Sequence, residues 1–229
     1  MNFNKLSILD EEDIQNICRN LNIKFDTKQK ALHELTQLYK NYENLNDNYI
    51  FKKKIGNKGK DGLVFLVSNN NDEKYAIKLF NSSKPKSQIV KEVEFQKKAA
   101  LQNIAPNIVK HDPNMKYIIM EIMDQHLTDF ITERNGKLPL NIQKQIVDIL
   151  TKLDEICIFQ SDPNILNFMF KDKKLYMIDY GMCKNIDEKT IRKLNTNKPN
   201  ILYTLPCIIL HLKNANCDPT SYEYLSKFV

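Results

Sequence analysis

The stretch FQSDPNILNFMFKDKKLYMIDYGMC, residues 159–183, carries the strongest structural and chemical signal in the chain. Two apolar segments, FMF and LYMI, flank the polar turn KDKK, which is the pattern of a β-hairpin. Asn167 enters the first arm and Asp179 leaves the second, so the hairpin would bring an amide oxygen and a carboxylate together at its open end. Oxygen ligands of this kind suit Mg²⁺ that carries the phosphates of ATP.

Asp162 is placed on the loop before this hairpin, five positions ahead of Asn167. From there its carboxylate could accept or orient the proton of an incoming hydroxyl group. Asp179, Tyr180 and Gly181 form a D-Y-G, in which we expect the glycine to turn the backbone sharply after the metal ligand. Each motif alone is common in unrelated chains, but the combination at this spacing indicates phosphoryl transfer.

Three of the five glycines fall together upstream, as Gly56, Gly59 and Gly62 in IGNKGKDGLVFLV. Glycine lets backbone N–H groups approach a phosphate closely, so this strand, turn and strand could cover a nucleotide or form a plain hairpin. Fourteen residues beyond Val64, YAIK ends on Lys78, in a strand position from which a lysine can pair with the α- and β-phosphates. A solvent-facing lysine is the simpler alternative, which the position after a glycine-rich hairpin disfavours.

A buried Lys78 needs an acidic partner, and the next expected helix offers Glu92 and Glu94 in KEVEFQKKA. Glu92 is preferred, because Phe95 and a later alanine share its helical neighbourhood while lysines follow Glu94 at the same spacings. Ordinary surface charges are the alternative for both glutamates.

The periodicity of apolar residues predicts an α+β chain. Helices are expected over 10–44, 87–101 and 142–157 and through most of the tail, and strands over 50–80 and 116–123. Strands with one helix first, followed mainly by helices, favour two lobes with a cleft between them. The expected organisation is a helical segment over 1–46 and one domain over 47–229, whose lobes span about 47–120 and 124–229.

With these motifs in this order, residues 49–184 resemble the protein-kinase-like superfamily, in particular its small atypical members and the kinase-like proteins of large DNA viruses. The resemblance implies a two-lobed kinase-like fold with a minimal C-lobe. It also implies ATP and Mg²⁺ as cofactors, and a protein substrate that could be the chain itself.

The resemblance further implies a role for each matching residue. Asp162 would be the catalytic aspartate, Lys78 and Glu92 an ion pair, and Asn167 and Asp179 the metal ligands. The nucleotide would be covered by the glycine-rich turn and held by an adenine pocket and an interlobe hinge, formed by Ile55, Val64, Ala76, Met120, Glu121, Ile122 and Met123.

Several positions depart from the family pattern. Gln160 and Ser161 stand where the family has His-Arg or His-Gly, and Asn164 stands where protein kinases have a lysine. The missing histidine is expected to weaken support for the loop, and no A-P-E follows the D-Y-G. Three hypotheses remain open: a Ser/Thr protein kinase, a pseudokinase that acts as a binding module, and a small-molecule phosphotransferase. Gly181 after Asp179 favours a protein kinase.

The composition of the chain limits the cellular compartments and binding partners that we expect. No apolar stretch is long enough to span a bilayer, the amino terminus lacks a signal-peptide pattern, and five cysteines without a C-x-x-C argue against disulfides and zinc. We therefore expect an intracellular, reducing compartment (cytoplasm, or a virion for a viral protein) and no membrane partner. The net charge of +6 is mild, and the faintly SAP-like pattern within 1–46 carries about as many acids as bases. Nucleic-acid binding is therefore disfavoured, with the segment 1–46 as the one place where it remains an alternative.

Overall fold

The computed structural model describes residues 11–12, 14–15, 18, 24–40, 49–55, 62–81 and 83–229, the side chains of 36–40 and 51 excepted. The chain divides into two units, Met1–Ser83 with Lys110–Ile122 (unit 1) and Lys84–Val109 with Met123–Val229 (unit 2). No helix among the described residues has the length and apolar character needed to cross a membrane.

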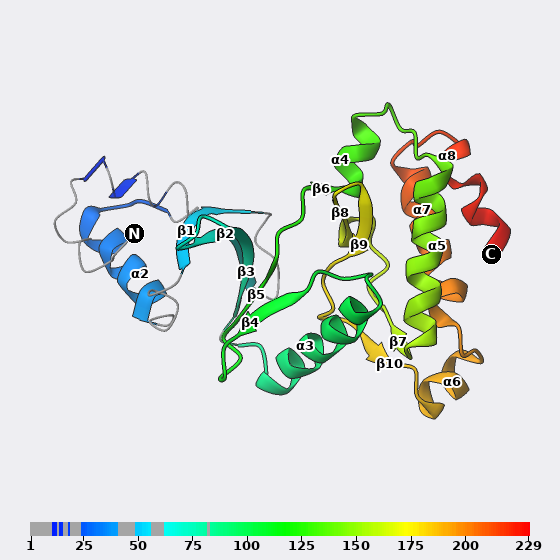
Figure 1. Cartoon of the computed structure of the whole chain (residues 1–229), viewed down its shortest axis with the longest axis horizontal. Helices are drawn as coiled ribbons and strands as arrows, with labels where there is room; N and C mark the ends of the chain where they lie inside the picture. Colours follow the sequence, from blue (N-terminus) through cyan, green and yellow to red (C-terminus); the bar gives the residue numbers. More distant parts are fainter. Residues whose placement is uncertain are drawn as a thin grey trace. The chain divides into compact units, whose positions relative to one another are not determined.

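Unit 1 is built on an antiparallel sheet (Figure 1). Its first three strands pair as a meander, which confirms the prediction over 50–80. The strands, in the spatial order of the sheet, are β1 (Tyr49–Lys54), β2 (Gly62–Asn69), β3 (Lys74–Phe80), β5 (Tyr117–Glu121) and β4 (Ile108–His111).

One face of this sheet is closed by an apolar core. Side chains alternate between the two faces of a strand, so Ile77 and Leu79 of β3 point into this core together. Ala31 and Leu35, one turn apart on the helix α2 (Lys28–Lys40), belong to the same buried cluster, as do Ile14 and Cys18. The neighbouring β3 residues Ala76 and Lys78 therefore point to the opposite face.

Unit 2 is mainly helical (Figure 1). Its buried apolar side chains form one large core. Its α-helices are α3 (Lys86–Leu101), α4 (Leu127–Thr132), α5 (Leu140–Glu155), α6 (Glu188–Leu194), α7 (Leu205–Asn214) and α8 (Thr220–Glu223). Other helical turns are η3 (Ile165–Asn167), η4 (Asn200–Thr204) and η5 (Leu225–Phe228). Short strands are β6 (Gln125–His126), β7 (Ile158–Phe159), β8 (Phe168–Lys171), β9 (Lys174–Met177) and β10 (Lys184–Asn185).

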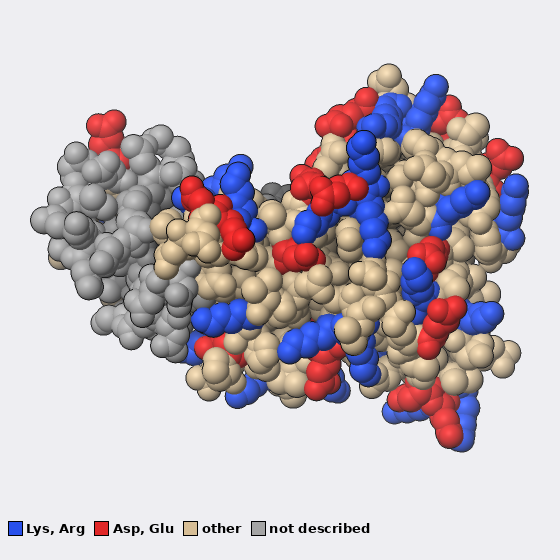
Figure 2. All heavy atoms as spheres, viewed as in Figure 1, with Lys and Arg blue, Asp and Glu red and all other residues tan. Residues whose placement is uncertain are grey.

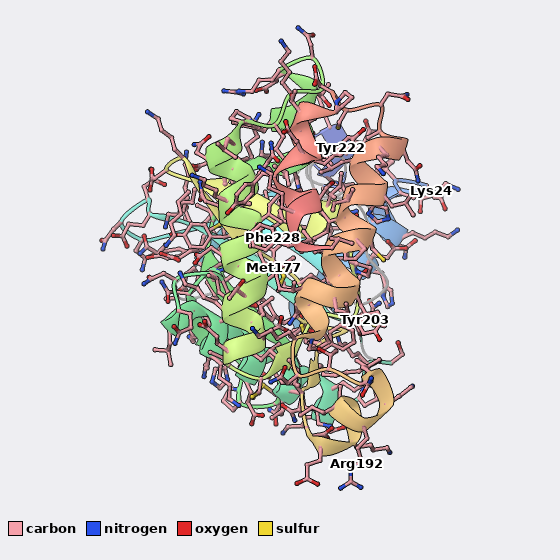
Figure 3. All side chains as sticks on the ribbon, turned by 90° about the vertical axis from the view of Figure 1, so that its right-hand side faces the viewer. Lys24, Met177, Arg192, Tyr203, Tyr222 and Phe228 are labelled. Atoms are coloured by element: carbon pink, nitrogen blue, oxygen red, sulfur yellow. The ribbon has the colours of Figure 1, made fainter. Side chains whose placement is uncertain are left out.

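The helix α5 is the central support of unit 2. Ile142, Ile146, Ile149 and Leu153 recur at helical spacing and are all buried in the core. Figure 3 looks onto α5, drawn in yellow-green, and onto α7, drawn in orange, whose Ile208 enters the same core.

The pairing of β8 and β9 confirms the β-hairpin predicted within the 159–183 stretch. Phe168 pairs with Met177, and the two strands are joined through Asp172 and Lys173. Both turn residues have positive φ, 50° and 65°, as a tight hairpin with right-handed strand twist requires. The backbone N–H of Met177 also donates to the carbonyl of Ile104 at 2.8 Å, which ties the hairpin to the end of α3.

Candidate functional site

Four of the predicted nucleotide-binding residues share one face of the unit 1 sheet. Lys78 lies opposite Val64 of β2, and Ala76 lies opposite Met120 of β5. Residues directly opposite each other in an antiparallel pair project to the same side, and Ala76 and Lys78 are two positions apart on β3. The face opposite the apolar core therefore carries a lysine among apolar side chains.

Lys78 is enclosed, with only 8% of its surface exposed. Its Nζ lies 5.6 Å from the centroid of the Phe80 ring, which is within the range of a cation–π contact. An enclosed ammonium group on a sheet face differs from the solvent-facing lysine that was the simpler alternative.

The other predicted residues of unit 1 lie around the edges of this face. The N–H of Ile55 donates to the carbonyl of Val64 at 2.9 Å, which holds Ile55 beside β2. Glu121 pairs with Tyr75, so its side chain projects to the opposite face from that of Met120. Ile122 follows directly, and Met123, the next residue, belongs to unit 2.

Gly62 has a structural reason to be glycine. A Cβ at this position would lie 2.0 Å from the carbonyl oxygen of Leu79, far inside van der Waals contact. The close approach of β2 to β3 thus excludes a side chain at Gly62. This requirement for glycine is independent of any role in covering a nucleotide. Gly56 and Gly59, the other two members of the predicted glycine-rich turn, lie outside the described residues.

Glu92 is buried in α3, whereas Glu94 is exposed. The Nζ of Lys84 lies 2.7 Å from Oε2 of Glu92, and the two side chains are only 5% and 1% exposed. Sequence reasoning did not identify Lys84, which precedes Pro85 at the start of the helix. The eight-residue separation is not a within-helix spacing, so no periodic signal marked this pair.

The loop after β7 brings Asp162 and Asn167 together. The Nδ2 of Asn167 donates to both Oδ2 and the carbonyl oxygen of Asp162, each at 3.1 Å. The intervening turn η3 is capped by Asn164, whose Oδ1 accepts from the N–H of Leu166 at 3.0 Å. The five-residue spacing therefore lets the chain fold back so that the Asn167 side chain reaches the Asp162 carboxylate.

Asp179 is linked to the same loop through its neighbour. The N–H of Ile178 donates to the carbonyl of Asn167 at 2.7 Å. Asp179 itself has φ of 62°, and its Oδ1 accepts from the N–H of Gly181 at 3.1 Å. The chain turns at Gly181 as predicted, where the N–H of Cys183 donates to the carbonyl of Tyr180 at 3.1 Å. The left-handed torsion lies at Asp179 instead of the glycine, and the Asp179 carboxylate stabilises it by bonding two residues ahead.

Gln160 supports this loop in the absence of the family's histidine. Its Oε1 accepts from the N–H of Asp162 at 3.1 Å, and its Nε2 donates to the carbonyl of Asp179 at 3.0 Å. The expectation that the loop would lose support is therefore corrected: an amide side chain supplies two hydrogen bonds at this position. No local pattern in the sequence marked Gln160 for this role.

The thiol of Cys183 lies close enough to three acidic groups of unit 2 for their charges to act on it. Burial raises the pKa of Cys183 well above its usual value, and the negative charges of Asp179, Glu92 and Asp162 raise it further. Cys183 therefore remains a neutral thiol and is a poor nucleophile. The same proximity shows that three of the predicted functional carboxylates share one electrostatic environment.

Asn167 and Asp179 together offer few protein ligands, which suits Mg²⁺ bound partly by phosphates and water better than a metal ion bound only by protein side chains. The part of the chain that the structure describes contains no group of three or more His, Cys, Asp or Glu able to hold a metal ion. Mg²⁺ is commonly bound by one or two carboxylates together with substrate phosphates and water. A single carboxylate beside an amide oxygen matches that mode of binding.

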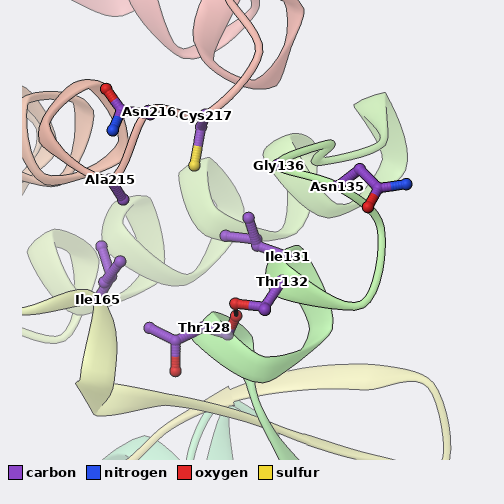
Figure 4. Close-up of a pocket in the computed structure, with 9 residues that line it drawn as sticks. All are labelled: Thr128, Ile131, Thr132, Asn135, Gly136, Ile165, Ala215, Asn216 and Cys217. Carbon is purple, nitrogen blue, oxygen red and sulfur yellow. Dashed lines mark hydrogen bonds between the residues drawn. The ribbon is translucent and has the colours of Figure 1, made fainter.

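A separate cavity of about 280 Å³ lies on unit 2, shown in Figure 4. None of the predicted functional residues lines it, and its lining carries no charged side chain. It therefore lacks the groups needed to hold a nucleotide phosphate. The lining residues are Thr128, Ile131, Thr132, Asn135, Gly136, Ile165, Ala215, Asn216 and Cys217.

Basic and acidic side chains alternate over the face of unit 2 in Figure 2. A surface that binds nucleic acid through its backbone would instead gather Lys and Arg. This face gives no support to nucleic-acid binding.

Comparison with family models finds a match to the protein kinase domain over residues 49–220. The matched region covers more than half of the chain and includes Lys78, Glu92, Asp162, Asn167 and Asp179. No curated protein matches the chain.

Proposed function

The chain belongs to the protein kinase family, and on this premise we propose that it is an ATP- and Mg²⁺-dependent phosphotransferase that phosphorylates Ser or Thr on proteins. One observation carries the proposal: Asn167 bonds the carboxylate of Asp162 at 3.1 Å, at the end of the hairpin from which Asp179 emerges. Asp162, Asn167 and Asp179 thus meet where the loop joins the open end of the hairpin, and this supports their proposed roles as base and metal ligands.

In the proposed reaction, the γ-phosphoryl group moves from ATP to a hydroxyl oxygen, and ADP and a phosphate ester are formed. Asp162 orients the hydroxyl group and accepts its proton. Lys78 balances the negative charge of the α- and β-phosphates, and its enclosure on an apolar sheet face strengthens that interaction. Glu92 is proposed as the acidic partner of Lys78, the role that the family resemblance implies. In the structure, Oε2 of Glu92 lies 2.7 Å from Nζ of Lys84.

Asn167 and Asp179 are the proposed magnesium ligands, through the amide Oδ1 and the carboxylate. Bound Mg²⁺ would neutralise negative charge on the phosphates during transfer. The Nδ2 of Asn167 bonds Asp162, so the two ends of one amide serve the base and the metal. The adenine ring is proposed to contact Ile55, Val64, Ala76 and the segment Met120–Met123, a proposal supported by the shared sheet face of Val64, Ala76 and Met120.

We also propose that the chain is a small, atypical kinase of the kind found in large DNA viruses. This is supported by Gln160 and Ser161 in place of the family's His-Arg or His-Gly. The segment after Gly181 is short, since the helix α6 already begins at Glu188. The proposed domain is 47–229, preceded by a helical segment over 1–46, and the proposed compartment is intracellular and reducing.

The deciding experiment measures thermal stabilisation by ATP with and without Mg²⁺, followed by transfer of phosphate from γ-labelled ATP. Asp179→Asn should lose most of the Mg²⁺-dependent stabilisation while its melting temperature without ligand stays close to that of the parent. Asp148→Asn, the same change at an exposed position on α5, is the matched control. Equal stabilisation of parent and Asp179→Asn would remove Asp179 from the metal site.

The transfer assay separates the alternatives. Asp162→Ala should retain ATP binding and lose phosphoryl transfer by about 10² to 10⁴. A parent protein that binds Mg²⁺ and ATP without transfer would be a pseudokinase. Labelling confined to small molecules would instead indicate a small-molecule phosphotransferase.

A further inference from the structure

A chain of buried hydrogen bonds begins at Asp154 near the end of α5. Its Oδ1 accepts from the backbone N–H of Asn200 at 3.0 Å and from the side-chain Nδ2 of Asn200 at 2.7 Å. Its Oδ2 accepts from the N–H of Ile201 at 3.2 Å. Three donors on one buried carboxylate fix both the backbone and the rotamer of Asn200.

Asn200 and Thr204 in turn hold the backbone of Gln160. The N–H of Gln160 donates to Oδ1 of Asn200 at 2.8 Å, and the carbonyl of Gln160 accepts from Oγ1 of Thr204 at 2.9 Å. The two anchors lie at either end of the helical turn η4, forty residues beyond the loop. The position of Gln160 is therefore set by a distant part of unit 2.

The side chain of Gln160 then reaches both functional carboxylate residues. It accepts from the N–H of Asp162 and donates to the carbonyl of Asp179, and the residue is only 1% exposed. A buried amide that satisfies one donor and one acceptor can hold only one orientation, since a flip would face like groups together. Gln160 thus couples the backbone positions of the proposed base and the proposed metal ligand.

Asp179 needs such a restraint. A residue other than glycine with φ of 62° is in a sparsely populated conformation, which persists where surrounding contacts determine it. The hydrogen bond from Gln160 acts on the carbonyl of Asp179, immediately after this strained torsion. Its loss would let the peptide group after Asp179 rotate and move the carboxylate.

We propose that Gln160 is a positioning residue that fixes the backbone of Asp162 relative to that of Asp179, and that Asp154, Asn200 and Thr204 support the site by holding Gln160. Asn200 also donates to the carbonyl of Ile158 at 2.7 Å, on the strand before the loop. The proposal rests on the proposed function for its consequence, a well-placed magnesium ligand. The hydrogen-bond bridge itself can be tested in the protein without any ligand.

The first test uses Gln160→Glu. A carboxylate of the same shape still accepts from Asp162 but has no donor for the carbonyl of Asp179. We expect the Mg²⁺ concentration for half-maximal stabilisation by ATP to rise by about tenfold or more, as for other groups that orient metal ligands. The ATP concentration that half-saturates the protein without Mg²⁺ should change far less.

Gln143→Glu is the matched control. Gln143 is also buried in unit 2, and its Nε2 donates to the carbonyls of Leu138 and Thr220 at 3.0 and 2.6 Å. The same substitution there also removes donors from buried carbonyls. If Gln160 were only structural, both variants would lose stability and keep the parent's Mg²⁺ dependence, and that result would overturn the proposal.

If Gln160→Glu folds poorly, a second variant and a second measurement test the proposal. Thr204→Val removes only the hydroxyl donor to Gln160 and should raise the half-saturating Mg²⁺ concentration in the same direction. Amide hydrogen exchange of the ligand-free parent should show a protected Asp162 N–H that becomes exchangeable in Gln160→Leu and stays protected in Gln143→Leu. Unchanged Asp162 protection in Gln160→Leu would refute the bridge. If Gln160→Leu loses that protection but the parent protein does not bind Mg²⁺ with ATP, the bridge stands and only the proposed function is refuted.

Discussion

The amide of Asn167 donates to the carboxylate Oδ2 and to the carbonyl oxygen of Asp162, each at 3.1 Å. One side chain thus fixes both the backbone and the carboxylate of the proposed catalytic aspartate. The bond is possible because η3 folds the five-residue spacing back on itself, with Asn164 as its cap. The spacing that identified these residues in the sequence is therefore also the spacing that builds the contact.

Asn167→Asp should remove both hydrogen bonds that this amide donates to Asp162. It removes the donor and places a second carboxylate beside Asp162, so we expect phosphoryl transfer to fall by about 10² or more in single-turnover measurements with labelled ATP. Asn164→Asp is the matched control, because its carboxylate can still accept from Leu166 and aspartate is a good cap. Similar losses in the two variants would mean that a general charge effect, and not the Asp162 contact, is responsible.

The buried carboxylate of Asp154 should leave a signature in the pH dependence of stability. Burial raises its pKa above the ordinary value, and hydrogen bonds from Asn200 and Ile201 lower it only in part. The folded protein therefore holds this proton more tightly than the unfolded chain. The contribution of Asp154 to stability is greatest below its ordinary pKa and decreases as the pH rises through the raised folded value.

Denaturant unfolding of the parent and of Asp154→Asn across this pH range measures that contribution. The difference in unfolding free energy between parent and variant should shrink as the pH increases. Asp148→Asn, on the exposed face of the same helix, should not show this trend. A difference that grows with pH would show that the hydrogen bonds outweigh burial and that the pKa is lowered.

Local patterns predicted the parts of the site that depend on nearby residues. The hairpin 168–177 follows from alternating apolar residues around a polar turn, and the Asp162 to Asn167 contact closes within six residues. Lys84 and Gln160 were not identified in these roles, because their partners are set by packing. Gln160 bonds Asp179 and Asn200, nineteen and forty positions away.

The D-Y-G shows a different limit of sequence reasoning. The turn expected at Gly181 is present, because the N–H of Cys183 donates to the carbonyl of Tyr180 at 3.1 Å. Glycine is the usual residue for a left-handed backbone, yet the left-handed torsion lies at Asp179. Aspartate can also adopt this conformation when its carboxylate bonds the backbone two residues ahead, and Asp179 does so. The motif therefore predicted the turn after Asp179, but not which residue takes the left-handed torsion.

Gly62→Ala should destabilise unit 1. The added methyl group would meet the carbonyl oxygen of Leu79 at 2.0 Å, so β2 and β3 must separate, at a cost of about 3 kcal/mol. Ser68→Ala, on the same strand, is the control, because its buried hydroxyl has no hydrogen-bond partner among the described residues. Denaturant unfolding should show a loss for Gly62→Ala and no loss for Ser68→Ala. A neutral Gly62→Ala would mean that the strand pairing is looser than described.

Tyr180→Phe should stabilise unit 2 or leave it unchanged. The Tyr180 hydroxyl is buried, and no described group bonds it, so its removal relieves a desolvation cost of about 1 kcal/mol. Tyr203→Phe provides the opposite case, because the Tyr203 hydroxyl donates to the carbonyl of Leu194 at 2.9 Å. Calorimetric melting should therefore rise or hold for the first variant and decrease for the second. A clear loss for Tyr180→Phe would point to a partner for its hydroxyl.

The short segment after the D-Y-G bears on the substrate. Only the six residues 182–187, which include the two-residue strand β10, separate Gly181 from α6, and this is too short for the long ordered segment that holds an extended peptide in protein kinases. Short peptides should therefore be poor substrates. A folded partner can be positioned by contacts away from the reacting groups, and so can exposed serines of the chain such as Ser83 and Ser87.

We expect phosphate from γ-labelled ATP to appear on the protein itself, and a random Ser/Thr peptide library to be labelled far less. Asp162→Ala should abolish self-labelling if the chain's own catalytic aspartate is responsible. Ser83→Ala combined with Ser87→Ala should remove part of the label and leave ATP binding unchanged, because neither residue belongs to the proposed site. Turnover of generic short peptides at the rate of self-labelling would show that the helices after α6 still form a peptide groove.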